Sequence, residues 1–172
     1  MINKIFALPV VEQLTPVLSR RQIDGADVIV VDHPRVKASV ALNGAHLLSW
    51  KPEGEAEGLW LSDATSFKQG AAIRGGVPIC WPWFGPSAQP GLPSHGFARN
   101  QQWTLKAHNE DDSGAVLTLL DEPLAAPDTP SISYLLQALE AEARAPRWPG
   151  RAVLVAHYDA LGDLPWCARI AL

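Results

Sequence analysis

The sequence predicts an all-β fold, and three observations support this prediction. Short apolar runs with the two-residue period of β-strands fill the first two thirds of the chain. Clusters of turn-forming residues separate these runs. Hydrophobic residues make up 47% of the 172 residues and charged residues 19%, which is enough for a globular domain with its own core. We therefore expect a single domain over residues 1–172.

The first strands are expected as a hairpin. Residues 26–31 (ADVIVV) are rich in β-branched side chains, which favour strands. Residues 36–42 (VKASVAL) carry an apolar residue at every second position, which indicates a strand with one buried face. The turn signal at 32–35 joins the two. Further strands are expected at 45–50, 59–61, 102–108 and 115–120.

The pattern changes beyond residue 120. Residues 121–130 (DEPLAAPDTP) are typical of a linker or a cluster of turns. Apolar residues then recur at helical spacing and predict a short helix near 131–144; they are Ile132, Leu135, Leu136 and Leu139. Residues 152–158 (AVLVAHY) return to strand character, and residues 167–172 alternate weakly.

Charge and cysteine content narrow the class of protein. The formal net charge is -4, which argues against a nucleic-acid or anionic-membrane partner because both select basic surfaces. Cys80 and Cys167 lack the spacing of a metal site and are expected to be free thiols in a reducing compartment. No apolar run approaches the roughly 20 residues needed to span a bilayer, and no signal peptide is expected. A soluble, cytoplasmic protein is the simplest expectation.

The segment from 70 to 100 is the candidate functional region. It is dense in glycine and proline but also carries three large aromatic residues, Trp81, Trp83 and Phe84. A loop that serves only as a connection does not need such side chains, and long ordered loops are often functional. We expect a binding site built from this segment on the concave face of one sheet.

Four residues in this segment suit a phosphorylated sugar. Arg74 and Arg99 offer planar guanidinium groups that bind phosphate or hydroxyl oxygens in pairs. Trp81 offers an apolar face to a sugar ring, and His95 can donate or accept a hydrogen bond near neutral pH. Each residue also has a simpler interpretation: a surface arginine, a structural histidine or a core tryptophan.

The order of motifs is more specific than the composition. GAHLLSW at 44–50 is followed by LWLS at 59–62, RGGVPICWPWFG at 74–85 and PSHGFARN at 93–100. This order resembles the hexose-6-phosphate mutarotase branch of the aldose 1-epimerase superfamily, closely up to about residue 120. The resemblance implies a galactose-mutarotase-like β-supersandwich, incomplete because the chain corresponds to its amino-terminal part.

The resemblance also implies a function. The family interconverts the α and β anomers of glucose 6-phosphate by acid-base ring opening, with no cofactor or metal. Arg74 and Arg99 match the family's substrate contacts, and Ser94 and His95 match the pocket positions beside them. A hexose 6-phosphate is therefore the expected small-molecule partner.

The family's catalytic histidine and glutamate belong to later motifs, which we do not find in this sequence. His157 does not stand in the motif of the catalytic acid. Three interpretations stay open: a glucose-6-phosphate 1-epimerase, a catalytically inactive sugar-phosphate-binding module, and a truncated fragment. The exchange rate between the anomers, measured by NMR, would separate the first from the second.

Overall fold

The computed structural model describes most of the chain and contains two compact units, Met1–Trp103 and Thr104–Leu172. The described residues are 1–68, 70–81, 83–88, 90–121, 153–157 and 166–171. Their regular secondary structure is mainly β-strand, which confirms the all-β prediction. The helix expected near 131–144 lies outside the described residues.

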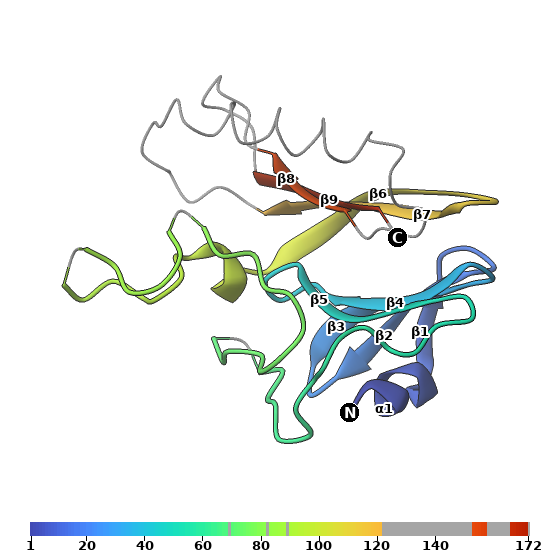
Figure 1. Cartoon of the computed structure of the whole chain (residues 1–172), viewed down its shortest axis with the longest axis horizontal. Helices are drawn as coiled ribbons and strands as arrows, with labels where there is room; N and C mark the ends of the chain where they lie inside the picture. Colours follow the sequence, from blue (N-terminus) through green and yellow to red (C-terminus); the bar gives the residue numbers. More distant parts are fainter. Residues whose placement is uncertain (69, 82, 89, 122–152, 158–165, 172) are drawn as a thin grey trace. The chain divides into compact units, whose positions relative to one another are not determined.

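The first unit is built on a five-stranded antiparallel sheet in which every strand pairs with its neighbour in the sequence (Figure 1). The strands are β1 (Val10–Gln13), β2 (Leu18–Ile23), β3 (Ala26–His33), β4 (Val36–Ala41) and β5 (His46–Pro52). The predicted hairpin of 26–31 and 36–42 is therefore confirmed. β1 and β2 are additional to the strands expected from the sequence.

Tight turns fix the register of the first hairpins. Asp24 and Gly25 have φ angles of 51° and 82° and connect β2 directly to β3. Ile23 of β2 and Ala26 of β3 form the last pair before this turn. Positive φ at both turn positions matches the right-handed twist of the flanking strands. The β3–β4 turn is held by the backbone N–H of Arg35, which donates to His33 Nδ1 over 3.1 Å.

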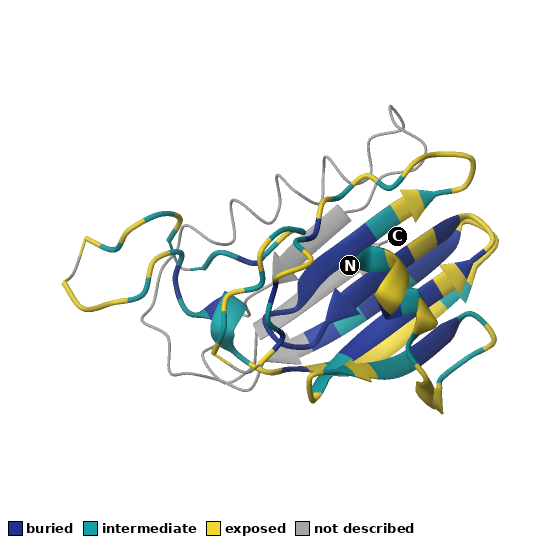
Figure 2. Cartoon of the chain, turned by 90° about the horizontal axis from the view of Figure 1, so that it is seen from below, coloured by how far each residue is buried: buried dark blue, intermediate teal, exposed yellow. Residues whose placement is uncertain are grey.

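Strand β4 is buried on both faces, so the expectation of one buried face was wrong. Four consecutive residues, Ala38–Ala41, are buried, and neighbouring residues in a strand point to opposite faces. Ser39 fits this environment because its hydroxyl pairs with that of Ser49 on β5 over 2.8 Å. Figure 2 shows the central strands as buried and the loops as mostly exposed.

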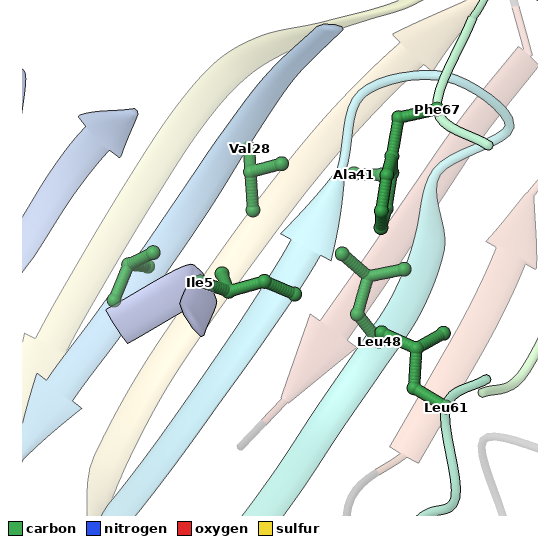
Figure 3. Packing of buried hydrophobic residues seen from close by; sticks show 7 residues of the cluster. Ile5, Val28, Ala41, Leu48, Leu61 and Phe67 are labelled. Atoms are coloured by element: carbon green, nitrogen blue, oxygen red, sulfur yellow. The ribbon is translucent and has the colours of Figure 1, made fainter. Parts of the chain in front are cut away.

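One face of this sheet is covered by α1 (Ile2–Ala7) and by the segment that follows β5 (Figure 3). Their side chains meet in one apolar cluster, composed of Ile5, Val28, Val30, Ala41, Leu48, Leu61 and Phe67. The expected strand at 59–61 does not form. Leu61 makes an isolated bridge with Gly75 instead, because this segment pairs with the loop that follows.

The second unit contains a four-stranded sheet in the order β6-β7-β9-β8. Its strands are β6 (Trp103–Asp111), β7 (Gly114–Asp121), β8 (Val153–His157) and β9 (Trp166–Ala171). β9 pairs antiparallel with both β7 and β8. The strand predictions at 102–108, 115–120, 152–158 and 167–172 are confirmed over the described residues.

Candidate functional site

The segment that carries Arg74 is attached to strand β5 by backbone hydrogen bonds. Leu47 and Val77 exchange two of them, of 3.1 and 2.8 Å. The N–H of Gly76 donates to the carbonyl of Trp60 over 2.8 Å. The Arg74 N–H donates to the buried Thr65 hydroxyl over 2.7 Å. The position of Arg74 is therefore fixed by the sheet and by the preceding segment.

The glycine pair after Arg74 is required by close backbone contacts. A Cβ atom on Gly75 would lie 2.3 Å from the Trp60 carbonyl oxygen, and one on Gly76 would lie 2.3 Å from the Leu47 carbonyl oxygen. Both glycines also have positive φ, 105° and 64°. Only glycine combines this conformation with so close an approach.

His46 lies beneath this segment and holds it in place. Its side chain is buried, and Nε2–H donates to the Gly75 carbonyl over 2.7 Å. Burial lowers the pKa of His46, the bond to Gly75 partly opposes this change, and the positive charge of Arg99 adds to it, so that the pKa falls to about 4. His46 is therefore neutral near pH 7. Sequence reasoning interpreted it as an ordinary strand residue and missed this role.

Aromatic side chains and backbone bonds organise the loop from 81 to 97. The Trp81 carbonyl accepts from the N–H groups of Phe97 and Ala98, at 2.7 and 3.3 Å. The Trp83 indole donates to the Pro93 carbonyl over 3.1 Å and packs edge-on against Phe97, with ring centroids 5.1 Å apart. These contacts give the loop a fixed shape without regular secondary structure.

His95 is held by one residue through two hydrogen bonds. Its N–H donates to the Gly85 carbonyl over 2.7 Å, and its Nδ1 accepts from the Gly85 N–H over 3.0 Å. The ring also packs edge-on against Phe84, with ring centroids 4.8 Å apart. His95 has a φ of 66°, an uncommon value for a residue with a side chain.

Arg99 joins the expected site residues of this loop. It lies in a short 3₁₀ turn, Ala98–Asn100, and its Nη2 donates to the Ser94 carbonyl over 2.8 Å. Its backbone packs against Gly44, where a Cβ atom would lie 2.4 Å from the Arg99 carbonyl oxygen. The structure thus brings Ser94, His95 and Arg99 together. Arg74 belongs to another segment of the same unit, which His46 holds through the Gly75 carbonyl.

Two arginine charges at this site have no carboxylate partner among the described residues. Arg20 and Arg35 each form ion pairs with acidic side chains, at 2.9 to 3.2 Å. Arg74 is exposed and Arg99 half-buried, and neither forms such a pair within the described part of the chain. The Nε of Arg99 is buried and makes no hydrogen bond with the described residues. Each of the two guanidinium groups can therefore attract an anion.

Trp60 is a further candidate that sequence reasoning missed. Trp60 is 70% exposed, which is uncommon for so large an apolar residue. Its ring lies close to Gly75, since a Cβ atom built there would be 3.0 Å from the ring. Trp60 thus stands beside the Arg74 segment with an open aromatic surface. Trp81 is half-buried and contributes backbone contacts, so the expectation that its ring contacts a sugar stays a prediction.

Fold and loop contacts together describe a β-sheet protein whose glycine-rich segments present two arginines and a histidine. The family model of aldose 1-epimerase matches residues 27–137, more than half of the chain. The chain belongs to the aldose 1-epimerase family. This confirms the expected resemblance and fold class, since the aldose 1-epimerase fold is a β-sandwich.

Individual relatives agree with the family. The chain is 79% identical over 118 residues to a "Putative glucose-6-phosphate 1-epimerase" of Salmonella typhimurium and 73% identical to one of Escherichia coli. Each match covers 69% of this chain and 40% of the relative. A crystal structure of a "putative mutarotase" from Salmonella typhimurium matches with a TM-score of 0.70 and 64% identity, over 91% of this chain and 47% of that one. The chain thus spans less than half the length of these relatives.

Two further findings concern only the residues that the structure describes. None of their helices is long and apolar enough to cross a membrane. They contain no cluster of three or more histidine, cysteine, aspartate or glutamate side chains able to hold a metal ion. The cytoplasmic location and the absence of a cofactor stay predictions from the sequence.

Proposed function

We propose that the chain binds a hexose 6-phosphate and belongs to a protein that interconverts its α and β anomers, as a glucose-6-phosphate 1-epimerase. The observation that carries this proposal concerns two arginines, Arg74 and Arg99, which have no carboxylate partner among the described residues and lie in the segment that the family model matches. A phosphate monoester brings about -1.5 to -2 charges at neutral pH, which such a pair would neutralise.

The surrounding residues support a sugar ring next to the phosphate. His95 and the exposed side chain of Ser94 adjoin Arg99, and they offer hydrogen bonds to hydroxyl groups. The indole of Trp60, beside the Arg74 segment, offers a surface for the apolar C–H face of a pyranose. The names of the relatives point to the same substrate class.

The proposed reaction needs two proton transfers. A general acid delivers a proton to the ring oxygen while a general base removes the proton of the anomeric hydroxyl, so that the C1–O5 bond breaks and a C1 carbonyl forms. Rotation about C1–C2 and reclosure then give the other anomer. Each positioned proton-transfer group contributes about 10²- to 10⁴-fold to the rate.

A second function, binding without turnover, is favoured by the chemistry of the two site histidines. His46 is buried and neutral, and the Nδ1 of His95 is engaged by Gly85, so neither is arranged for proton transfer in the described part of the chain.

Exchange NMR on the α and β anomers of glucose 6-phosphate distinguishes the two functions. An exchange rate raised several thousand-fold by the chain over buffer at matched phosphate concentration supports the enzyme. A buffer-like rate with binding intact supports the binding module. If the folded protein shows neither acceleration nor binding, both functions are contradicted.

A further inference from the structure

Asn43 and Gly44 form the one Asn-Gly dipeptide of the chain, at the turn between β4 and β5. In such a pair the glycine nitrogen can attack the side-chain carbonyl carbon of the asparagine, because glycine has no side chain to block the approach. The other asparagines precede lysine, glutamine or glutamate, whose side chains hinder this attack; they are Asn3, Asn100 and Asn109. Spontaneous deamidation is therefore favoured at Asn43.

The side-chain amide of Asn43 is buried but is not held by hydrogen bonds. Asn43 is 2% exposed, and neither its Oδ1 nor its Nδ2 forms a hydrogen bond with the described residues. Buried side-chain amides in folded proteins are normally bonded. No such bond has to break before Nδ2 leaves as ammonia, so restraint on the reaction comes from the backbone.

The backbone nitrogen that would attack is held by another segment of the same unit, residues 101–103. The Gly44 N–H donates to the Gln101 carbonyl over 2.7 Å. The Trp103 N–H donates to the Leu42 carbonyl over 2.8 Å, on the other side of the dipeptide. While the segment is bound in this way, the Gly44 nitrogen keeps its proton and does not act as a nucleophile.

We propose that Asn43 is a deamidation site whose rate is set by local opening of segment 101–103. Once the bond to Gln101 opens, the Gly44 nitrogen loses its proton to hydroxide and bonds to Asn43 Cγ. The Cγ–Nδ2 bond breaks, Nδ2 takes a proton from water and leaves as ammonia, and a succinimide ring remains. Water then opens the ring at either carbonyl and yields aspartate or isoaspartate. This proposal does not depend on sugar-phosphate binding.

The isoaspartate product alters the turn that positions His46. Its main chain runs through the former side chain, which adds a carbon atom between β4 and β5. Ala41 and His46 are the last paired residues of these strands, and His46 holds the Gly75 carbonyl over 2.7 Å. We expect the isoaspartate form to unfold at a lower urea concentration than the unmodified chain, and equal midpoints would overturn this part of the proposal.

Peptide mapping by mass spectrometry tests the site on the full chain. Folded chain in buffer and unfolded chain in urea are incubated at the same mildly alkaline pH. In the unfolded chain Asn43 should react faster than Asn3 and Asn109. In the folded chain Asn43 should react at least about 10-fold more slowly, which corresponds to an opening free energy of about 1.4 kcal/mol. A rate at Asn43 no higher than at the other two in urea would overturn the site, and equal rates in folded and unfolded chain would overturn control by the fold.

Low urea concentrations, at which the chain stays folded, distinguish local from global opening. Local opening exposes little surface, so the rate at Asn43 in the folded chain should depend only weakly on urea. A dependence as steep as that of global unfolding would overturn control by segment 101–103.

The matched control is Asn43→Gln, compared with wild type in urea so that folding of the variant does not matter. Its longer side chain would have to close a six-membered ring, which forms far more slowly than the five-membered succinimide. Deamidation at position 43 should therefore nearly disappear. A wild-type rate in this variant would refute cyclisation through Gly44.

Discussion

Acidification is expected to destabilise the protein through His46. The pKa of its imidazole is about 4 in the folded protein and 6.5 when it is unperturbed. Between these values the unfolded chain binds a proton that the folded protein does not, so the free energy of unfolding falls as the pH decreases from 6.5 toward 4. Each pKa unit corresponds to about 1.4 kcal/mol, so the gap of about 2.5 units is worth about 3 kcal/mol. Above pH 6.5 both states hold neutral His46, and the free energy of unfolding no longer changes through this residue.

Urea unfolding at several pH values between about 7 and about 4.5 measures this effect. His46→Gln is the informative variant, because its amide can still donate to the Gly75 carbonyl but does not titrate. The difference in unfolding free energy between wild type and this variant should change by about 2 to 3 kcal/mol over that range. His108→Gln, which replaces an exposed histidine, controls for the substitution itself. Parallel pH dependences in wild type and His46→Gln would refute the reasoning.

Three other substitutions are expected to give the following results. Gly75→Ala should lower the free energy of unfolding in urea by at least about 2 kcal/mol, because the new Cβ would meet backbone atoms. Gly54→Ala, at a position with positive φ but open space, should lower it by about 1 kcal/mol. Equal losses in the two variants would contradict the packing described at Gly75. Leu48 is fully buried, so Leu48→Ala should lower the free energy of unfolding by about 2 to 5 kcal/mol. Val11 is exposed, so Val11→Ala should lower it by less than about 0.5 kcal/mol. A larger loss in Val11→Ala than in Leu48→Ala would contradict the described core. Arg99→Ala should weaken glucose 6-phosphate binding about 10-fold or more in calorimetry and affect glucose less, whereas equal losses would assign Arg99 to the hydroxyls.

The sequence was most informative where local chemistry decides the structure. The β-branched run at 26–31, the turn at 32–35 and the alternation at 36–42 identify β3 and β4, because strand propensity and turn chemistry act over a few residues. Asp24 and Gly25 are a strong hairpin signal that would also have identified β2. The period at 36–42 did not reveal that small Ala41 and hydroxyl-paired Ser39 are buried too.

The candidate site was predictable only in part. Motif order singles out Arg74, His95 and Arg99, and the structure bonds Arg99 to the carbonyl of Ser94, the residue before His95. The contact of His46 with Gly75 links residues 29 positions apart, and no local pattern reports it. The hydrogen bond from the Gly85 N–H to His95 Nδ1 likewise depends on how the loop folds. That residues 1–172 form one domain, and that the named residues bind substrate, stay predictions.

Calorimetric titration of the 172-residue chain with glucose 6-phosphate tests the proposed site most directly. We predict saturable binding at one site, weaker binding of glucose, and a loss of affinity in both Arg74→Ala and Arg99→Ala. A thermal melt of each protein establishes that it is folded. Absence of binding by folded wild-type chain, or equal affinity for glucose and glucose 6-phosphate in wild type and both variants, would contradict a sugar-phosphate site at these two arginines.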